Sequence, residues 1–145
     1  MLFEGLGNAI HLIAAVVLVG GLLVLVAGLR PAFTRAFPSE MERERVLSAV
    51  HRRFVVLAGV AAVILLATGF MMMTQNQQFH GFGHYDNAWS KLLLAKHVLF
   101  VGMIVLLVLL RSPRPVKIEN DLVELALLVG VAILAVTGFL TAAKP

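Results

Sequence analysis

The sequence predicts an all-α integral membrane protein, one domain over residues 1–145 folded as an up-down bundle of four transmembrane helices. The first observation is composition: 60% of the 145 residues are hydrophobic and 14% are charged, with a mean hydropathy of +0.94. A soluble domain of this length cannot bury so much apolar surface. The second observation is that four apolar runs approach or exceed the ~20 residues that a helix needs to cross the hydrocarbon core, too long for strands of a membrane barrel. The predicted spans cover residues 6–29, 54–74, 92–110 and 122–142.

The first span has neither a basic segment before it nor a small-residue cleavage site after it, so we interpret it as a retained helix rather than a signal peptide. Small residues recur along it every seven positions: Gly7, Ala14, Gly21 and Gly28. His11 lies four residues after Gly7 and three before Ala14, which places it on this stripe. We therefore expect His11 to point into the bundle, where helices or a flat ligand approach closely.

The second span follows the polar segment RPAFTRAFPSEMERERVLSAVHRR, residues 30–53. We expect an amphipathic interfacial helix over Ser39–His51, with Ser39 as its N-cap and three glutamates in its first turns. His51 stands beside Arg52 and Arg53. We expect it in the headgroup region, without a ligand role.

The second and fourth spans carry similar stretches, AVILLATGF (Ala62–Phe70) and VAILAVTGF (Val131–Phe139). The identical positions are Ile64/Ile133, Leu65/Leu134, Thr68/Thr137, Gly69/Gly138 and Phe70/Phe139. We interpret the chain as a helical hairpin used twice in the same orientation, which would relate the halves by a pseudo-twofold axis along the membrane normal. The alternative is chance similarity between two apolar helices. Short links, with Pro113 and Pro115 before the last span, favour antiparallel neighbours.

Basic residues are unevenly distributed among the connections. Six arginines lie between spans one and two, and Arg111, Arg114 and Lys117 lie between spans three and four, whereas QNQQFHGFGHYDNAWS between spans two and three has neither Lys nor Arg. This is the positive-inside pattern, which predicts a bacterial-type cytoplasmic membrane protein with both termini on the outer side. The high pI of about 10.1 therefore reflects topology and contacts with anionic lipid, and we expect no nucleic-acid partner.

Polar side chains within the spans are the candidate functional residues, because they are costly in hydrocarbon. His11 and His97 each lie about five residues inside the outer end of a span, on the order of 8 Å deep. With Gly69 and Gly138 at a similar depth, two facing imidazoles suit bis-histidine ligation of haem b iron. Lys91 and Lys96 would then pair with its propionates. The alternative is that the histidines bond backbone carbonyls or the threonines Thr68 and Thr137.

A second candidate site lies at the outer end of span two. Its donors are three thioethers and two loop imidazoles: Met71, Met72, Met73, His80 and His84. Thioether and imidazole ligands suit Cu(I), and the chain has no cysteine. Against a copper site, methionines commonly fill packing gaps at helix ends. Trp89 and Tyr85 are expected as interfacial anchors.

Four short stretches together resemble the CopD-like membrane domain of copper-resistance proteins: HLIAAVVLVGG from His11, RRF at the start of span two, the Thr-Gly at its end, and LLLAKH opening span three. The wider pattern is similar to HemJ-type protoporphyrinogen oxidases, small haem-binding helical bundles. By that resemblance, His11 corresponds to a functional histidine in the first span of those proteins, and Lys96 to a functional lysine at the start of their third span. Met41-Glu42-Arg43 resembles a Met-Glu-Arg stretch before their second span. The similarity covers nearly the whole chain.

Three functions therefore stay open from the sequence. The first is a haem b protein acting in electron transfer or oxidation of a porphyrinogen, with a quinone or another redox partner. The second is a copper-binding or copper-transport protein. The third is a non-catalytic membrane subunit whose histidines only cross-link helices, and all three are compatible with homo-oligomers. The absence of cysteine excludes thiolate chemistry and Cys-ligated zinc or iron–sulfur sites. No nucleophile–base pair, phosphate loop or paired carboxylates support a hydrolase or a kinase.

Overall fold

The computed structural model describes residues 2–75, 88–112 and 116–142. The first span is one continuous helical rod, built from α1 (Leu2–Ala15), η1 (Val16–Gly20), α2 (Gly21–Leu23), η2 (Val24–Leu29) and α3 (Arg30–Ala36). It is followed by α4 (Glu40–Thr74), α5 (Ala88–Arg111) and α6 (Val116–Ala142). Within the described residues, four helices are long and apolar enough to cross a membrane: Gly5–Ala36, Glu40–Thr74, Ala88–Arg111 and Ile118–Thr141. The predicted all-helical, four-span architecture is confirmed to this extent.

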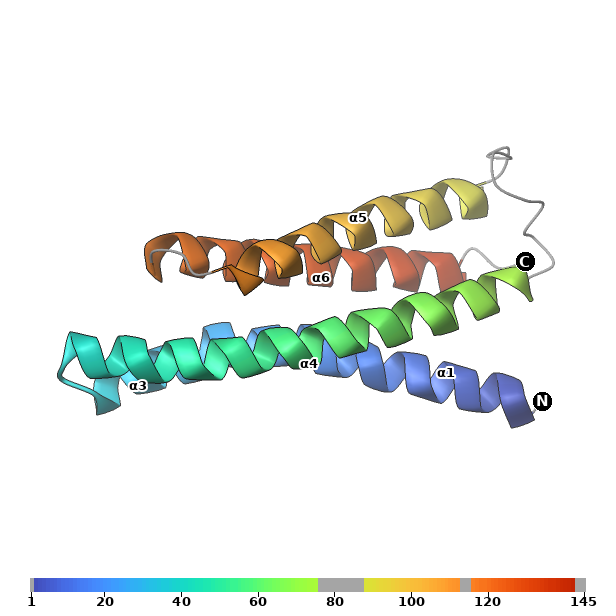
Figure 1. Cartoon of the computed structure of the whole chain (residues 1–145). Helices are drawn as coiled ribbons and strands as arrows, with labels where there is room; N and C mark the ends of the chain where they lie inside the picture. Colours follow the sequence, from blue (N-terminus) through green and yellow to red (C-terminus); the bar gives the residue numbers. More distant parts are fainter. Residues whose placement is uncertain (1, 76–87, 113–115, 143–145) are drawn as a thin grey trace.

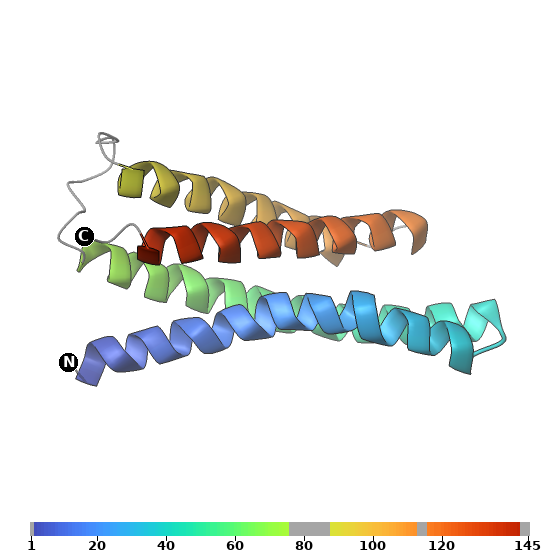
Figure 2. The ribbon, with the colours of Figure 1, turned by 180° about the vertical axis from the view of Figure 1, so that it is seen from behind.

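The four rods form two antiparallel pairs (Figures 1 and 2). The first span packs chiefly on α4, and α5 packs chiefly on α6. The pairs are joined because α4 also contacts α5 and the middle of the first span contacts α6. The start of α1 and the end of α6 lie at one end of the bundle, which we call the terminal end. The other end, where α3 meets α4, is called the α3–α4 end.

The first span is wound more loosely than an ordinary α-helix over two stretches, η1 and η2, which are π-helical. Gly7 and Ala14, which precede them, are buried as the seven-residue stripe predicts. Gly28 is exposed, with open space where a Cβ would stand. The stripe of small residues therefore does not stay packed to the end of the first span.

The second span is a single helix that includes the segment expected to form a separate interfacial helix. α4 has 35 residues, about 52 Å at the usual rise, which exceeds the ~30 Å hydrocarbon core. Ser39 caps it as predicted: its backbone is extended and its Oγ accepts the Glu42 N–H at 3.5 Å. No Gly or Pro occurs between Ser39 and Phe54 to interrupt the helix.

A narrow core runs between the rods. Leu18, Leu22, Met103 and Val123 are its largest fully buried side chains, and small residues of α4 such as Ala58 and Ala61 allow close helix approach. Many large apolar side chains on the outer faces remain exposed, for example Val63 at 66% and Leu128 at 67%. Exposure of this extent fits surfaces that face lipid.

Candidate functional site

At the terminal end, His11 forms a directed contact with α4. It is half-buried on α1, and its Nδ1–H donates to Thr68 Oγ1 at 2.7 Å. The Thr68 hydroxyl donates its single proton to the carbonyl oxygen of Ile64, also at 2.7 Å. Because that proton is used, Nδ1 of His11 must carry the hydrogen of the imidazole, which leaves a lone pair on Nε2. The predicted inward orientation of His11 is confirmed, and its bond to Thr68 is the one expected under the alternative to haem ligation.

Lys96 reaches the same region from the second helical pair. Its side chain is half-buried. The two residues lie at similar depth, nine residues after the start of α1 and eight after the start of α5, or about 12–14 Å along each helix. A histidine and a lysine thus lie at similar depth on separate helical pairs.

The packed face of α5 explains the position of Lys96. Trp89, Met103 and Leu110 are buried, and with Lys96 they form a series spaced by seven residues. Trp89 is 7% exposed, so its side chain packs inside the bundle and not at an interface as expected. Lys96 therefore occupies a core position of α5.

His97 does not face His11. It is exposed, and its Nδ1–H donates to the Leu93 carbonyl oxygen one turn earlier, at 2.7 Å. The prediction of two imidazoles facing each other is wrong because His97 lies about 100° around α5 from the packed face that Lys96 occupies. His97 instead forms the hydrogen bond to a backbone carbonyl that was the alternative to iron ligation.

Of the other residues predicted for this site, Gly69 lies beside His11, whereas Gly138 and Lys91 are exposed. Gly69 lies beside the imidazole: a Cβ built on it would be 3.5 Å from His11 Cε1. Gly138 is exposed, with nothing within 4 Å of such a Cβ, and Lys91 is exposed. The Thr137 hydroxyl donates to the Ile133 carbonyl at 2.7 Å, as Thr68 does to Ile64, but His97 is bonded elsewhere. The two halves therefore share the threonine geometry but not a histidine partner.

The three thioethers of the copper hypothesis do not converge. Met73 is buried and Met72 is exposed, while a Cβ on Gly7 would lie 2.5 Å from the Met71 methyl group. Consecutive helical residues point about 100° apart, which explains the divergence. His80, His84 and Tyr85 lie outside the described residues.

A second polar cluster, which we did not predict, lies at the α3–α4 end. His51 is 7% exposed, and its Nδ1–H donates to the Glu119 carboxylate. Arg30 donates to Glu124 Oε1 at 3.1 Å and to the Asn120 carbonyl at 3.2 Å. His51 is buried against α6 because the single long α4 carries its packed face back to this residue. Its expected depth in the headgroup region stays a prediction.

That packed face was detectable in the sequence. His51 stands four residues before Val55, seven before Ala58 and fourteen before Leu65, all buried. The spacing is the seven-residue pattern of a core stripe. The flanking Arg52 and Arg53 obscured it.

The side chains near His11 restrict which kind of metal or cofactor can bind at the terminal end. Within the ranges that the structure describes, no three His, Cys, Asp or Glu side chains are grouped to hold a bare metal ion. The Nε2 of His11 would suit an iron whose remaining ligands come mainly from a macrocycle, with Nδ1–H held by a hydrogen bond as is usual for a ligating histidine. The exposed His97 does not fit bis-histidine ligation with His11.

Comparison of the chain with protein-family models, curated proteins and solved structures gave no match.

Proposed function

We propose that the protein binds a tetrapyrrole, haem b or a related porphyrin or porphyrinogen, between His11 and Lys96 at the terminal end, and acts there in electron transfer or porphyrinogen oxidation. The supporting observation is the half-buried pair itself: an imidazole with a free Nε2 and an ammonium group at similar depth on separate helical pairs. Intramembrane ionisable residues are functional candidates by default. The resemblance to HemJ-type proteins rests on the same two residues.

Each residue has a stated role in this proposal. His11 offers Nε2 to iron or, with a metal-free porphyrinogen, accepts a proton there. Thr68 holds the imidazole ring in one orientation through Nδ1–H, which avoids a loss of side-chain entropy on binding. Lys96 pairs with a propionate of the bound macrocycle. The attraction between the two charges is stronger there than in water, because the effective dielectric constant inside the bundle is lower. The bound haem supplies one-electron chemistry, and a quinone or another redox partner is the electron acceptor.

This arrangement replaces the two-histidine site expected from the sequence. His97, being exposed on α5, has no part in the proposal. Gly69 contributes by having no side chain beside the imidazole.

The proposed location is a bacterial-type cytoplasmic membrane, with both chain termini on the outer side. The distribution of Lys and Arg among the connections supports this orientation. The tetrapyrrole would then lie near the outer surface, and the α3–α4 end would face the cytoplasm.

The visible absorption spectrum of detergent-purified protein from haem-replete cells tests the proposal. We expect a Soret band, with sharp α and β bands on reduction, and loss of these bands in His11→Ala. A colourless protein that takes up neither added hemin nor metal-free protoporphyrin would contradict it.

A further inference from the structure

We propose that the α3–α4 end binds a phospholipid with a zwitterionic primary-amine headgroup, of the phosphatidylethanolamine type. The headgroup would occupy a cavity between the first span, α4 and α6. This site is at the opposite end of the bundle from the His11–Lys96 pair, and the inference does not depend on the proposed tetrapyrrole.

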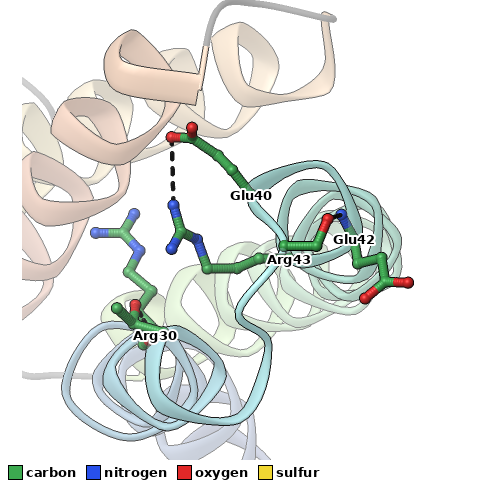
Figure 3. A network of polar contacts seen from close by, with 6 residues as sticks. Arg30, Glu40, Glu42 and Arg43 are labelled. Atoms are coloured by element: carbon green, nitrogen blue, oxygen red, sulfur yellow. Dashed lines mark hydrogen bonds and ion pairs between the residues drawn. The ribbon is translucent and has the colours of Figure 1, made fainter.

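The cavity has a volume of about 450 Å³. Polar or charged side chains provide all of its lining residues except one, Leu47: Arg30, Thr34, Glu40, Arg43, Glu44, Leu47 and Asn120. Figure 3 shows the guanidinium groups of Arg30 and Arg43 extending from two different helices into the same space, with the Glu40 carboxylate beside Arg43. Both signs of charge are therefore presented to one occupant.

The arginines have donors to spare for a phosphate. Arg30 donates to Glu124 and to the Asn120 carbonyl through Nη1 and Nη2, and a guanidinium has five N–H groups in all. The contact of Arg43 with Glu40 is long, 3.4 Å, and Glu40 is exposed. Because an exposed contact of this kind contributes little, Arg43 can turn toward a phosphate, which guanidinium groups bind through paired hydrogen bonds.

The charges that line the cavity favour a ligand that carries both a negative and a positive group. Two arginines and two glutamates line the cavity, so a simple anion would be repelled by Glu40 and Glu44. A phosphodiester linked to an ammonium group matches both signs. A primary ammonium also donates three hydrogen bonds to carboxylates and to the Asn120 and Thr34 oxygens, whereas a quaternary ammonium donates none.

A smaller polar cavity of about 30 Å³ adjoins the first and shares Arg30, Glu44, Leu47 and Asn120 with it. It is also lined by His51, whose Nε2 is buried without a hydrogen-bond partner among the described residues. The volume accommodates a water molecule. A water held there would link Nε2 to the headgroup, so the bound lipid would complete the polar cluster.

The position suits a lipid rather than a soluble ligand. Deeper in the first span, seven and six residues from Arg30, Leu23 and Val24 are 52% and 56% exposed. Acyl chains attached to a headgroup in the cavity can therefore run along apolar helix surface. The cavity also lies among the arginines that predict the cytoplasmic headgroup level.

Native mass spectrometry of the full chain in detergent tests the inference, with phosphatidylethanolamine, phosphatidylcholine and phosphatidylglycerol of identical acyl chains supplied in equal amounts. We expect preferential retention of phosphatidylethanolamine by the unaltered protein. Arg43→Gln and Glu44→Gln should each reduce that retention about tenfold, the effect of losing a charge-assisted hydrogen bond. Arg45→Gln and Glu42→Gln are matched controls on the same helix, since neither residue lines the cavity, and should leave retention unchanged.

Three results would overturn the inference. Equal retention of the three lipids, or equal effects of the cavity and control variants, would mean that the cavity does not recognise the headgroup. Preference for phosphatidylglycerol, lost in Arg43→Gln but not in Glu44→Gln, would make it an anion site. Displacement of the lipid by an equal concentration of glycerophosphoethanolamine would make the ligand a soluble compound. Unchanged helical circular dichroism confirms that each variant is folded.

Discussion

His11 and Thr68 form a hydrogen bond that determines which imidazole nitrogen is free. Thr68 has one hydroxyl proton, which it donates to Ile64, so it accepts from Nδ1–H of His11. The lone pair of His11 is therefore on Nε2, away from Thr68. This relay connects α1 to α4 and makes the ring orientation of His11 a property of both helices.

Thr68→Val tests this relay, because valine keeps the shape of threonine but removes the acceptor. A hydrogen bond that orients a ligating histidine typically contributes 10–100-fold in affinity for the metal. We therefore expect hemin affinity, measured by titration of the Soret band, to fall by about tenfold or more. Thr137→Val is the matched control, since Thr137 makes the same bond to the carbonyl four residues earlier but binds no histidine. Equal losses in the two variants would contradict a role for the relay.

The His51–Glu119 pair should stabilise the α3–α4 end. Glu119→Leu removes the acceptor of a buried Nδ1–H, which should lower the free energy of unfolding by about 1–3 kcal/mol. Fluorescence of the single tryptophan, Trp89, reports thermal unfolding in detergent. Replacing both partners by leucine should recover most of the loss, because no polar atom is then left unpaired. A double variant as unstable as the sum of the single ones would show that the pair is not coupled.

Gly21 should be intolerant of a side chain. A Cβ there would lie 2.5 Å from Phe54 Cε2 and 3.3 Å from Cδ2, and the ring is rigid. We expect Gly21→Ala to destabilise the protein by about 1–3 kcal/mol through overpacking. Gly59→Ala is the control, because nothing lies within 4 Å of its Cβ position, and it should be neutral or slightly stabilising. Combining Gly21→Ala with Phe54→Leu should restore the Tm; failure to do so would mean that the contact is not the cause.

The proposed orientation is testable because the chain has no cysteine. Thr141 and Arg45 are exposed near opposite ends of the bundle. In intact cells, a membrane-impermeant maleimide should label Thr141→Cys, and it should label Arg45→Cys only after the cells are permeabilised. The reverse pattern would place the chain termini on the cytoplasmic side.

Much of the fold could be predicted from hydropathy, because a length of about 20 apolar residues is a strong signal for a span. His11 could also be placed, since glycine and alanine make its stripe visible against larger residues. In α5 the contrast is lost: leucine and valine occupy both the packed and the exposed sides, so composition did not distinguish the face of Lys96 from that of His97.

The internal similarity of the spans also led the site prediction in the wrong direction. The repeat suggested that His97 corresponds to His11, and the threonines do share their geometry. Lys96 and His97 are nevertheless consecutive on α5 and point about 100° apart, so only one of them can face into the bundle. The seven-residue series of Trp89, Lys96, Met103 and Leu110 was the available signal. Using this signal would have meant assigning a lysine to the packed face of α5.

Hemin titration of two neighbouring variants, Lys96→Met and His97→Gln, tests the central claim most directly. Methionine keeps the length of the lysine side chain without its charge, and the Soret band reports binding. We predict that Lys96→Met weakens binding by about tenfold, the loss of a charge-assisted contact, and that His97→Gln binds hemin like the unaltered protein with the same reduced spectrum. Loss of binding in His97→Gln with Lys96→Met unaffected would contradict the account and restore the two-histidine site.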